Sequence, residues 1–465
     1  MLALIPISLW CALAQDAENP PAPEPAPAPP PEPAPAPAPE PAPEPAPAPA
    51  PEPAPAPPAA GEASAAAPLK PWRWAALPIA NFSSTYGLGY GAYANIVYNG
   101  TEPLGDLPYK AKIAVQAYFT TGSYYDHYVK MDFPGIGGSK FRWDFQAGVT
   151  GWPTASWYGV GNNPPRYDIT EPCNKEAQEH GLSSALAPVP CYYNYGQKAS
   201  FKVITNLRRE INGPVSGFVN AYVRNFNLNI YDNSLVDQTQ PVGVDGGLYT
   251  RLGVGLMYDT RNQEPSPTGG MFSEASVRGG MNVSDPSQKV FAFNVTDRRW
   301  IGFGKKKKVV LASREIVDMK WGEEPFFMSQ TIGGSEDLSV GTSVLLRGFS
   351  YARFTGDGAV FWTPELRWQF ATIPIGSAKL ELMTGPYFDV GRVWLWDPAA
   401  EGLDPEEGLN LHYSYGLGTR FIFNTNMVVR LDFGWSQDSV TNYVDPTQTL
   451  PDRNFGLYLV FDHPF

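Results

Sequence analysis

Residues that could carry out catalysis are few and scattered along this sequence of 465 residues. Its four histidines stand at His127, His180, His412 and His463. None of them belongs to an H-E-x-x-H zinc motif, and the chain contains no G-x-S-x-G nucleophile motif. The sequence therefore predicts a protein that is not an enzyme and that has no metal site and no cofactor.

Cysteine chemistry is limited to one pair. Removal of an N-terminal leader that contains Cys11 leaves Cys173 and Cys191. An even number of cysteines in an exported chain indicates a disulfide, and closing this loop would stabilise the fold by roughly 3 kcal/mol. The alternative is two free thiols, which are unusual in an oxidising compartment.

The composition favours a protein with much of its surface in lipid. Charged residues make up 17% of the chain and aromatic residues 13%, whereas a soluble domain carries about 25% charged residues. After the leader, no apolar stretch reaches the ~20 residues that a spanning helix requires. A membrane span without helices has to be a closed barrel, because lipid cannot hydrogen-bond the edge of a sheet. The competing class is an aromatic-rich soluble β-protein.

The charge pattern gives no sign of nucleic-acid binding. The net charge is −12, partly because of glutamates in a Pro-Ala-Glu tract. No basic stripe runs along the chain. The basic run Lys305–Lys308 is expected in a solvated turn near lipid headgroups.

The chain divides into three parts. Residues 1–14 are expected to be a signal peptide that ends at the A-x-A-type site Ala12-Leu13-Ala14; lipid attachment at Cys11 is the alternative. Residues 15–70 are expected to be a disordered periplasmic linker. Its Pro-Ala-Glu tract, roughly 45 residues of polyproline-II character, would extend about 140 Å. This linker is either a solvated tail or a segment that docks to the cell wall or a partner. Residues 71–465 are expected to form the outer-membrane β-barrel domain.

From Trp72 onward, apolar and polar side chains alternate with a period of two, which indicates β-strands. In the segment 358–371, for example, Trp362 and Leu366 alternate with Glu365 and Arg367. Strands of about ten residues with an apolar, often aromatic outer face and a polar inner face are typical of a membrane barrel.

The connections predict an all-β fold, a sixteen-stranded transmembrane antiparallel β-barrel with one long loop folded inward. Long connections fall at every second join, as extracellular loops should, and an even strand number keeps both ends in the periplasm. The strands are expected at residues 72–81, 87–99, 110–121, 125–133, 141–158, 199–209, 216–229, 248–259, 271–281, 290–300, 309–320, 358–371, 379–396, 411–423, 427–436 and 454–463.

The end of the chain matches a barrel-insertion signal. Asn454, Gly456, Leu459 and Phe461 fit the pattern polar-x-Gly-x-x-apolar-x-apolar, and the last residue is the aromatic Phe465. The pattern predicts a C-terminal strand that addresses the barrel insertion machinery during biogenesis.

Three motifs resemble those of the outer-membrane protein assembly superfamily, the bacterial surface antigen barrel domain of BamA, TamA and two-partner secretion transporters. Leu346-Arg347-Gly348-Phe349 is similar to the family's [VL]-R-G-[FY] motif in the sixth extracellular loop. Tyr387-Phe388-Asp389-Val390-Gly391 is similar to its [FY]-x-D-x-G motif, and the segment 258–269 resembles a strand–turn signature. The resemblance covers most of residues 72–465. The linker occupies the place of the family's POTRA domains, so the chain is similar to the POTRA-less branch.

The resemblance implies that a charge cluster pins the long loop inside the barrel. Glu365 and Arg367 share the polar face of one strand, and Asp389 lies on the inward face of the next, so Arg347 could meet both carboxylates in the lumen. Carboxylates paired with arginine are poor candidates for acid–base catalysis. The alternative is that these are ordinary lumen charges in water. The expected loop-pinning cluster consists of Arg347, Gly348, Phe349, Glu365, Arg367, Asp389 and Gly391.

The resemblance also implies a function. We expect a barrel in the bacterial outer membrane that aids protein insertion or translocation, with a separate periplasmic or lipoprotein partner or a protein client. The alternative is a passive pore or structural barrel plugged by its sixth loop. The other expected partners are the surrounding lipid and the insertion machinery.

Overall fold

The computed structural model describes residues 71–83, 87–101, 107–162, 164, 191–264, 266–341, 344–375, 378–403, 408–423, 427–436, 439–441, 449–451 and 455–461. The expected signal peptide and the Pro-Ala-Glu linker lie outside the described residues, and so do Cys173, Asn454 and Phe465.

The alternating segments of the sequence form long β-strands. The described residues form nineteen strands. Strands β8, β17 and β18 have two or three residues; the other sixteen, here called the long strands, have between six (β19) and nineteen residues. The strands are β1 (Trp72–Ser83), β2 (Gly87–Tyr98), β3 (Ala111–Thr120), β4 (Tyr125–Pro134), β5 (Phe141–Ser156), β6 (Asn194–Asn212), β7 (Val215–Phe226), β8 (Leu228–Asn229), β9 (Gly247–Asp259), β10 (Gly269–Asn282), β11 (Asp285–Phe303), β12 (Val309–Gly322), β13 (Gly358–Ile375), β14 (Ala378–Trp394), β15 (His412–Phe423), β16 (Met427–Ser436), β17 (Ser439–Thr441), β18 (Thr449–Pro451) and β19 (Gly456–Phe461).

The helices of the described residues are short and lie in the connections. They are η1 (Ile136–Gly138), η2 (Cys191–Tyr193), α3 (Leu235–Thr239), α4 (Phe326–Ser329) and η3 (Pro398–Glu401). None of the described helices is long and apolar enough to cross a membrane.

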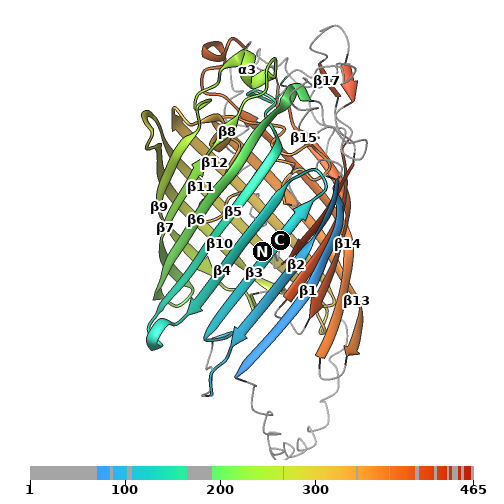
Figure 1. Cartoon of the computed structure of the whole chain (residues 1–465). Coiled ribbons are helices and arrows are strands. Elements are labelled where there is room, and N and C mark those ends of the chain that lie inside the picture. The colour runs from blue at the N-terminus through green and yellow to red at the C-terminus, as the bar shows by residue number, and fades with distance from the viewer. Residues whose placement is uncertain are drawn as a thin grey trace, which may run out of the picture.

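Each long strand pairs with the next in antiparallel register, from β1–β2 to β16–β19. The tilted strands surround an interior, as Figure 1 shows. β1 and β19 approach to within 8 Å between Cα atoms, but no hydrogen-bonded register joins them in the described part of the chain. The predicted all-β fold of sixteen long antiparallel strands is confirmed.

The two faces of the sheet differ as the alternation predicts. On β9, the side chain of Arg251 points inward and is 3% exposed, whereas the next residue, Leu252, is 68% exposed on the outer face. On β13, Glu365 is buried and Trp368 is 54% exposed. Lipid replaces water around the outer face, so an exposed apolar side chain there is in a favourable environment.

The long connections gather at one end of the barrel. α3 and β17 mark this end in Figure 1. The sixth connection at this end, here called loop 6 (residues 323–357), joins β12 to β13. The basic run Lys305–Lys308 lies exposed between β11 and β12 at the opposite end, in the turn that the sequence predicts.

Candidate functional site

Loop 6 folds into the barrel because its apolar side chains pack against inward-facing residues of the wall. Ile316 on β12, Phe361 on β13 and Val393 on β14 contribute to this core from the wall. The loop also makes its own backbone bonds, since Ile332 and Leu338 pair with each other at 2.8 and 2.9 Å. The loop 6 residues in the core are Ile332, Leu338, Val340, Val344, Leu345, Leu346, Phe349 and Phe354.

This packing carries Arg347 to the inner wall, where it is 0% exposed. Its Nε and Nη2 donate to the two oxygens of Asp389 at 2.9 and 2.7 Å, and its backbone N–H donates to Asp389 Oδ2 at 3.0 Å. Its Nη1 donates to Glu365 Oε1 at 2.9 Å and to Asp432 Oδ2 at 3.0 Å. One guanidinium therefore joins carboxylates from β13, β14 and β16.

An aromatic ring covers one face of this guanidinium. The Cζ atom of Arg347 lies 3.2 Å from the ring centroid of Tyr387, a geometry in which the cation is attracted to the ring face. The Tyr387 hydroxyl donates to the backbone oxygen of Phe433 at 3.0 Å. This bond connects the ring on β14 to the backbone of β16 and fixes its position.

The backbone of the motif needs a glycine after the arginine. Gly348 has a φ of +105°, and a Cβ atom at this position would lie 2.9 Å from the backbone carbon of Trp435. Its N–H donates to the hydroxyl of Tyr458 on β19 at 2.8 Å. Because loop 6 passes so close to the wall here, its backbone contacts the last strand.

Further arginines complete the charge network. Glu365 also accepts bonds from Arg367 at 2.9 and 2.7 Å and from Arg420. Arg430 lies 3.0 Å from Asp432 Oδ2. Four arginines thus share three carboxylates. We call this cluster the Arg347 latch; its members are Arg347, Glu365, Arg367, Tyr387, Asp389, Arg420, Arg430, Asp432 and Tyr458.

The latch holds Arg347 in its charged form. Burial alone would lower the pKa of this guanidinium, but Asp389, Asp432 and Glu365 raise the pKa well above its ordinary range. A buried charge that is fully paired and hydrogen-bonded is stable, whereas removal of one partner leaves an uncompensated charge. The arrangement is suited to holding a loop in place.

The structure brings four of the predicted site residues into one chain of ion pairs, namely Arg347, Glu365, Arg367 and Asp389. The other predicted members support this contact. Phe349 is buried in the loop 6 core. Gly391 lies against the ring of Phe361, because a Cβ atom there would be 2.2 Å from Phe361 Cδ1.

Sequence reasoning missed several members of the latch. The sequence did indicate that Arg430 and Asp432 face the lumen, because both fall on the polar face of the strand predicted at residues 427–436. Nothing in the sequence connected that face with Arg347 in loop 6, which lies 85 residues before Asp432. Arg420 carried the same signal in the strand predicted at residues 411–423, whereas Tyr458 had none.

The remaining predicted residues are placed only in part. Gly456 and Leu459 lie on β19, and Phe461 is its last residue. Cys191 begins η2, but Cys173 lies outside the described residues. The disulfide and the insertion signal therefore stay predictions.

The tip of loop 6 is attached to a different part of the wall. Glu336 pairs with Arg298 on β11 at 2.5 Å, and Asp337 pairs with Arg251 on β9 at 2.8 Å. The backbone N–H of Ser335 donates to Glu274 on β10 at 2.8 Å. We call these contacts of residues 335–337 the tip clasp. Burial would raise the pKa of Asp337, but Arg251 and Lys202 hold the pKa below its ordinary value.

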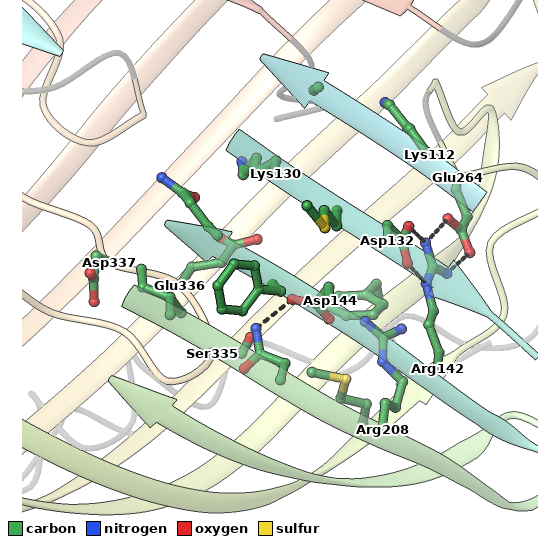
Figure 2. A pocket seen from close by; sticks show the side chains of 18 of the residues that line it. Lys112, Lys130, Asp132, Arg142, Asp144, Arg208, Glu264, Ser335, Glu336 and Asp337 are labelled. Carbon is green, nitrogen blue, oxygen red and sulfur yellow. Dashed lines mark hydrogen bonds and ion pairs between the residues drawn. The ribbon is translucent and has the colours of Figure 1, made fainter. Parts of the chain in front are cut away.

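A cavity of about 460 Å³ remains between the tip of loop 6 and strands β3 to β6. Figure 2 shows polar side chains of the wall, among them Lys130, Asp144 and Arg208, opposite the tip. At the far end of this cavity, Arg142 lies between Asp132 and Glu264 and pairs with both at 2.6 Å (Figure 2). Loop 6 also packs against β5, β6 and β7 through Phe326, Phe327 and Met328, so the cavity lies beside its tip rather than along its whole length.

Comparisons with known proteins add a family and several similar folds. The family model of the Omp85 superfamily domain matches residues 200–452. No curated protein matches the chain. A solved structure of BamA from Haemophilus ducreyi lacking POTRA domains 1–3 is 13% identical, with a TM-score of 0.48, and the match covers 84% of this chain and 70% of that one.

Two solved structures of CdiB are also similar. For CdiB from Escherichia coli the identity is 13% and the TM-score 0.48, with 85% of this chain and 63% of that chain covered. For CdiB from Acinetobacter baumannii the identity is 14% and the TM-score 0.45, with 84% and 60% covered. The chain thus spans less than two thirds of the CdiB chains that it matches.

The family match extends over more than half of the chain and includes loop 6, the tip clasp and every member of the Arg347 latch except Tyr458. Together with the barrel of sixteen long strands, it assigns the protein to the bacterial outer membrane. The chain belongs to the Omp85 superfamily.

Proposed function

We propose that this protein assists the insertion or export of proteins across the outer membrane, together with a separate partner, and that it is not an enzyme. The observation that carries the proposal is the position of the Arg347 latch beside the seam, as we call the place where β1 and β19 lie next to each other. The latch ties loop 6 to β13, β14 and β16, and Gly348 extends the attachment to Tyr458 on β19.

The seam offers a site at which a client strand could add to the barrel. Strands β1 and β19 lie close together without a hydrogen-bonded register between their described residues. β19 pairs with β16 over six residues, whereas β1 pairs with β2 over twelve. A strand edge recognises an extended partner by backbone hydrogen bonds. Loop 6 contacts the strand that carries this edge, because Gly348 bonds to Tyr458 on β19.

Site-specific photo-crosslinking in cells tests the proposal. A crosslinking residue in place of Ala76 on β1 or Leu457 on β19 is expected to capture an unfolded outer-membrane protein. The matched control is Val219 on β7, a strand that is paired on both sides, and it should capture none. Arg347→Ala is expected to reduce the capture at the seam.

The plugged or passive pore remains the competing function, and the cavity beside loop 6 gives it a physical basis. Single-channel recordings separate the two. A large, steady conductance together with no crosslinked client at either seam position would contradict the proposed assembly role. A small, flickering conductance with client capture supports it.

A further inference from the structure

Two lysines in the lumen have no carboxylate partner. Lys130 on β4, labelled in Figure 2, and Lys202 on β6 both line the cavity beside the tip clasp. Neither side chain forms a hydrogen bond or an ion pair within the described part of the chain; Lys130 lies over the ring of Tyr128, 5.9 Å from its centroid. The side chain of Lys130 is exposed to the cavity and that of Lys202 is half-buried, so a small ligand in the cavity can reach both.

A third donor without a partner lies beside these lysines. Gln146 on β5 lines the same cavity, and its amide makes no hydrogen bond to any described residue. Gln146 lies directly opposite Lys130 in the β4–β5 register, while Lys202 lies opposite Gly148, two residues further along β5. Neighbouring strands are about 4.8 Å apart and alternate residues of one strand about 7 Å apart. The long side chains of both lysines can therefore reach the space beside Gln146.

A glycine leaves room between the three donors. Gly148 occupies the position between Tyr128 on β4 and Lys202 on β6. A Cβ atom at Gly148 would lie 2.7 Å from the backbone oxygen of His127, so the wall does not accommodate a larger residue there. The donors therefore adjoin a space that no side chain of β5 fills, and one bound group could accept hydrogen bonds from all three.

The cavity as a whole carries an excess of positive charge. Its described lining residues include seven lysines and arginines but only five carboxylates. Ion pairs with arginine engage four of these carboxylates, and the fifth, Asp144, accepts a hydrogen bond from Asn206. Near Lys202 but outside the lining, Asp126 and Arg224 carry opposite charges and so leave this balance unchanged. The protein thus supplies donors at this place without a matching anion.

We propose that Lys130, Gln146 and Lys202 bind a phosphate group in this cavity, either inorganic phosphate or the phosphate of a small ester. Phosphate oxygens accept hydrogen bonds from several directions, which suits two flexible ammonium groups and an amide on three strands. A planar carboxylate is better matched by the fork of an arginine, as in the Arg347 latch. The volume of about 460 Å³ has room for a ligand larger than phosphate itself. Such binding does not depend on the proposed assembly function.

Isothermal titration calorimetry of the full chain in non-ionic detergent tests this site, with inorganic phosphate and glycerol 3-phosphate as separate ligands at constant ionic strength. The natural chain is expected to bind at least one of them saturably, and the tighter ligand identifies the source of the phosphate group. Lys130→Gln and Lys202→Gln should each weaken binding at least about tenfold, because each removes one of the two charges that contact the phosphate. Lys130→Arg keeps the charge and should stay within about threefold of the natural affinity.

A matched control separates a local site from an effect of net charge. Lys305→Gln removes the same charge from the exposed β11–β12 turn and should leave the affinity unchanged. The heat-dependent shift in gel mobility of a folded barrel verifies that each variant is folded. Saturating phosphate should also raise the unfolding temperature of the natural chain but not that of the variant with both Lys130→Gln and Lys202→Gln. No saturable binding of either ligand up to about 10 mM, or equal binding by the natural chain and this double variant, would overturn the proposal.

Discussion

At the scale of single residues, the latch depends on the planar, many-donor guanidinium of Arg347. Three carboxylates from three strands meet this one group, and its face lies on Tyr387. A lysine ammonium is a point charge without a flat face, so it could not make the paired bonds to Asp389 and the ring contact together. The glycine after it is required by the close approach of the backbone to Trp435.

Arg347→Ala should destabilise the barrel by about 3–5 kcal/mol, because three buried carboxylates lose a shared counter-charge. Urea unfolding in lipid vesicles measures the change. Lys140→Ala is the control; Lys140 pairs with Glu210 at an exposed site, and its loss should cost less than about 1 kcal/mol. Equal effects of the two substitutions would contradict the structural role of the latch.

The three carboxylates should not be equivalent. Asp389 accepts three bonds from Arg347, whereas Asp432 accepts one. We expect Asp389→Asn to release loop 6 more readily than Asp432→Asn, by a difference of about 1–2 kcal/mol, since bonds to charged groups contribute about 1.5–3 kcal/mol each. The same unfolding measurement ranks the two variants. The reverse order would contradict the idea that the number of bonds from Arg347 determines how strongly each carboxylate holds loop 6.

At the scale of elements, loop 6 is held at two separated places. The Arg347 latch attaches it to β13, β14 and β16, and the tip clasp attaches it to β9, β10 and β11. The apolar core of the loop lies between them. Two attachments on different parts of the wall restrict the loop more than either one alone, because releasing it requires both to break.

Limited proteolysis of loop 6 should reveal this cooperation. Arg347→Ala alone and Asp337→Ala alone are each expected to raise the cleavage rate modestly. The double variant should raise it by more than the product of the two single effects, since only then does the loop leave the lumen. If Arg347→Ala alone reaches the rate of the double variant, the tip clasp contributes nothing to holding the loop.

At the scale of the whole molecule, the lumen holds both loop 6 and a cavity beside the tip of this loop. Loop 6 packs against the wall of β12 to β14, and the cavity faces β3 to β6. The Arg142 contacts with Asp132 and Glu264 cross the periplasmic end of that cavity. These contacts link β4 and β5 to the turn after β9 and so close one end of the cavity.

The Glu264 contact should withstand moderate acid. Burial would raise the pKa of this carboxyl, but Arg142 lowers it from 4.5 to about 2. A depressed pKa means that the stabilisation is present above pH 4.5 and is lost as the pH falls toward 2. The difference in unfolding midpoint between the natural chain and Glu264→Gln should therefore stay constant from pH 7 to about 5 and vanish near pH 2. A difference that is already gone at pH 4.5 would contradict this pairing.

The strands of this protein are determined largely by its sequence. A period of two places side chains on alternate faces whatever the rest of the chain does, so the predicted segments 309–320 and 427–436 correspond closely to β12 and β16. The same periodicity is sufficient to place Glu365 and Arg367 on the lumen side of their strand. The resemblance of the Arg347 motif then indicated which loop would meet them.

The tertiary structure alone decided how these faces are used. Asp432 pairs with Arg347 across 85 residues, and Glu336 pairs with Arg298 on another strand. Alternation specifies a face but not the neighbour across it, because barrel closure and the path of a long loop depend on packing summed over the whole chain. For that reason the latch partners and the cavity could be found only in the folded protein.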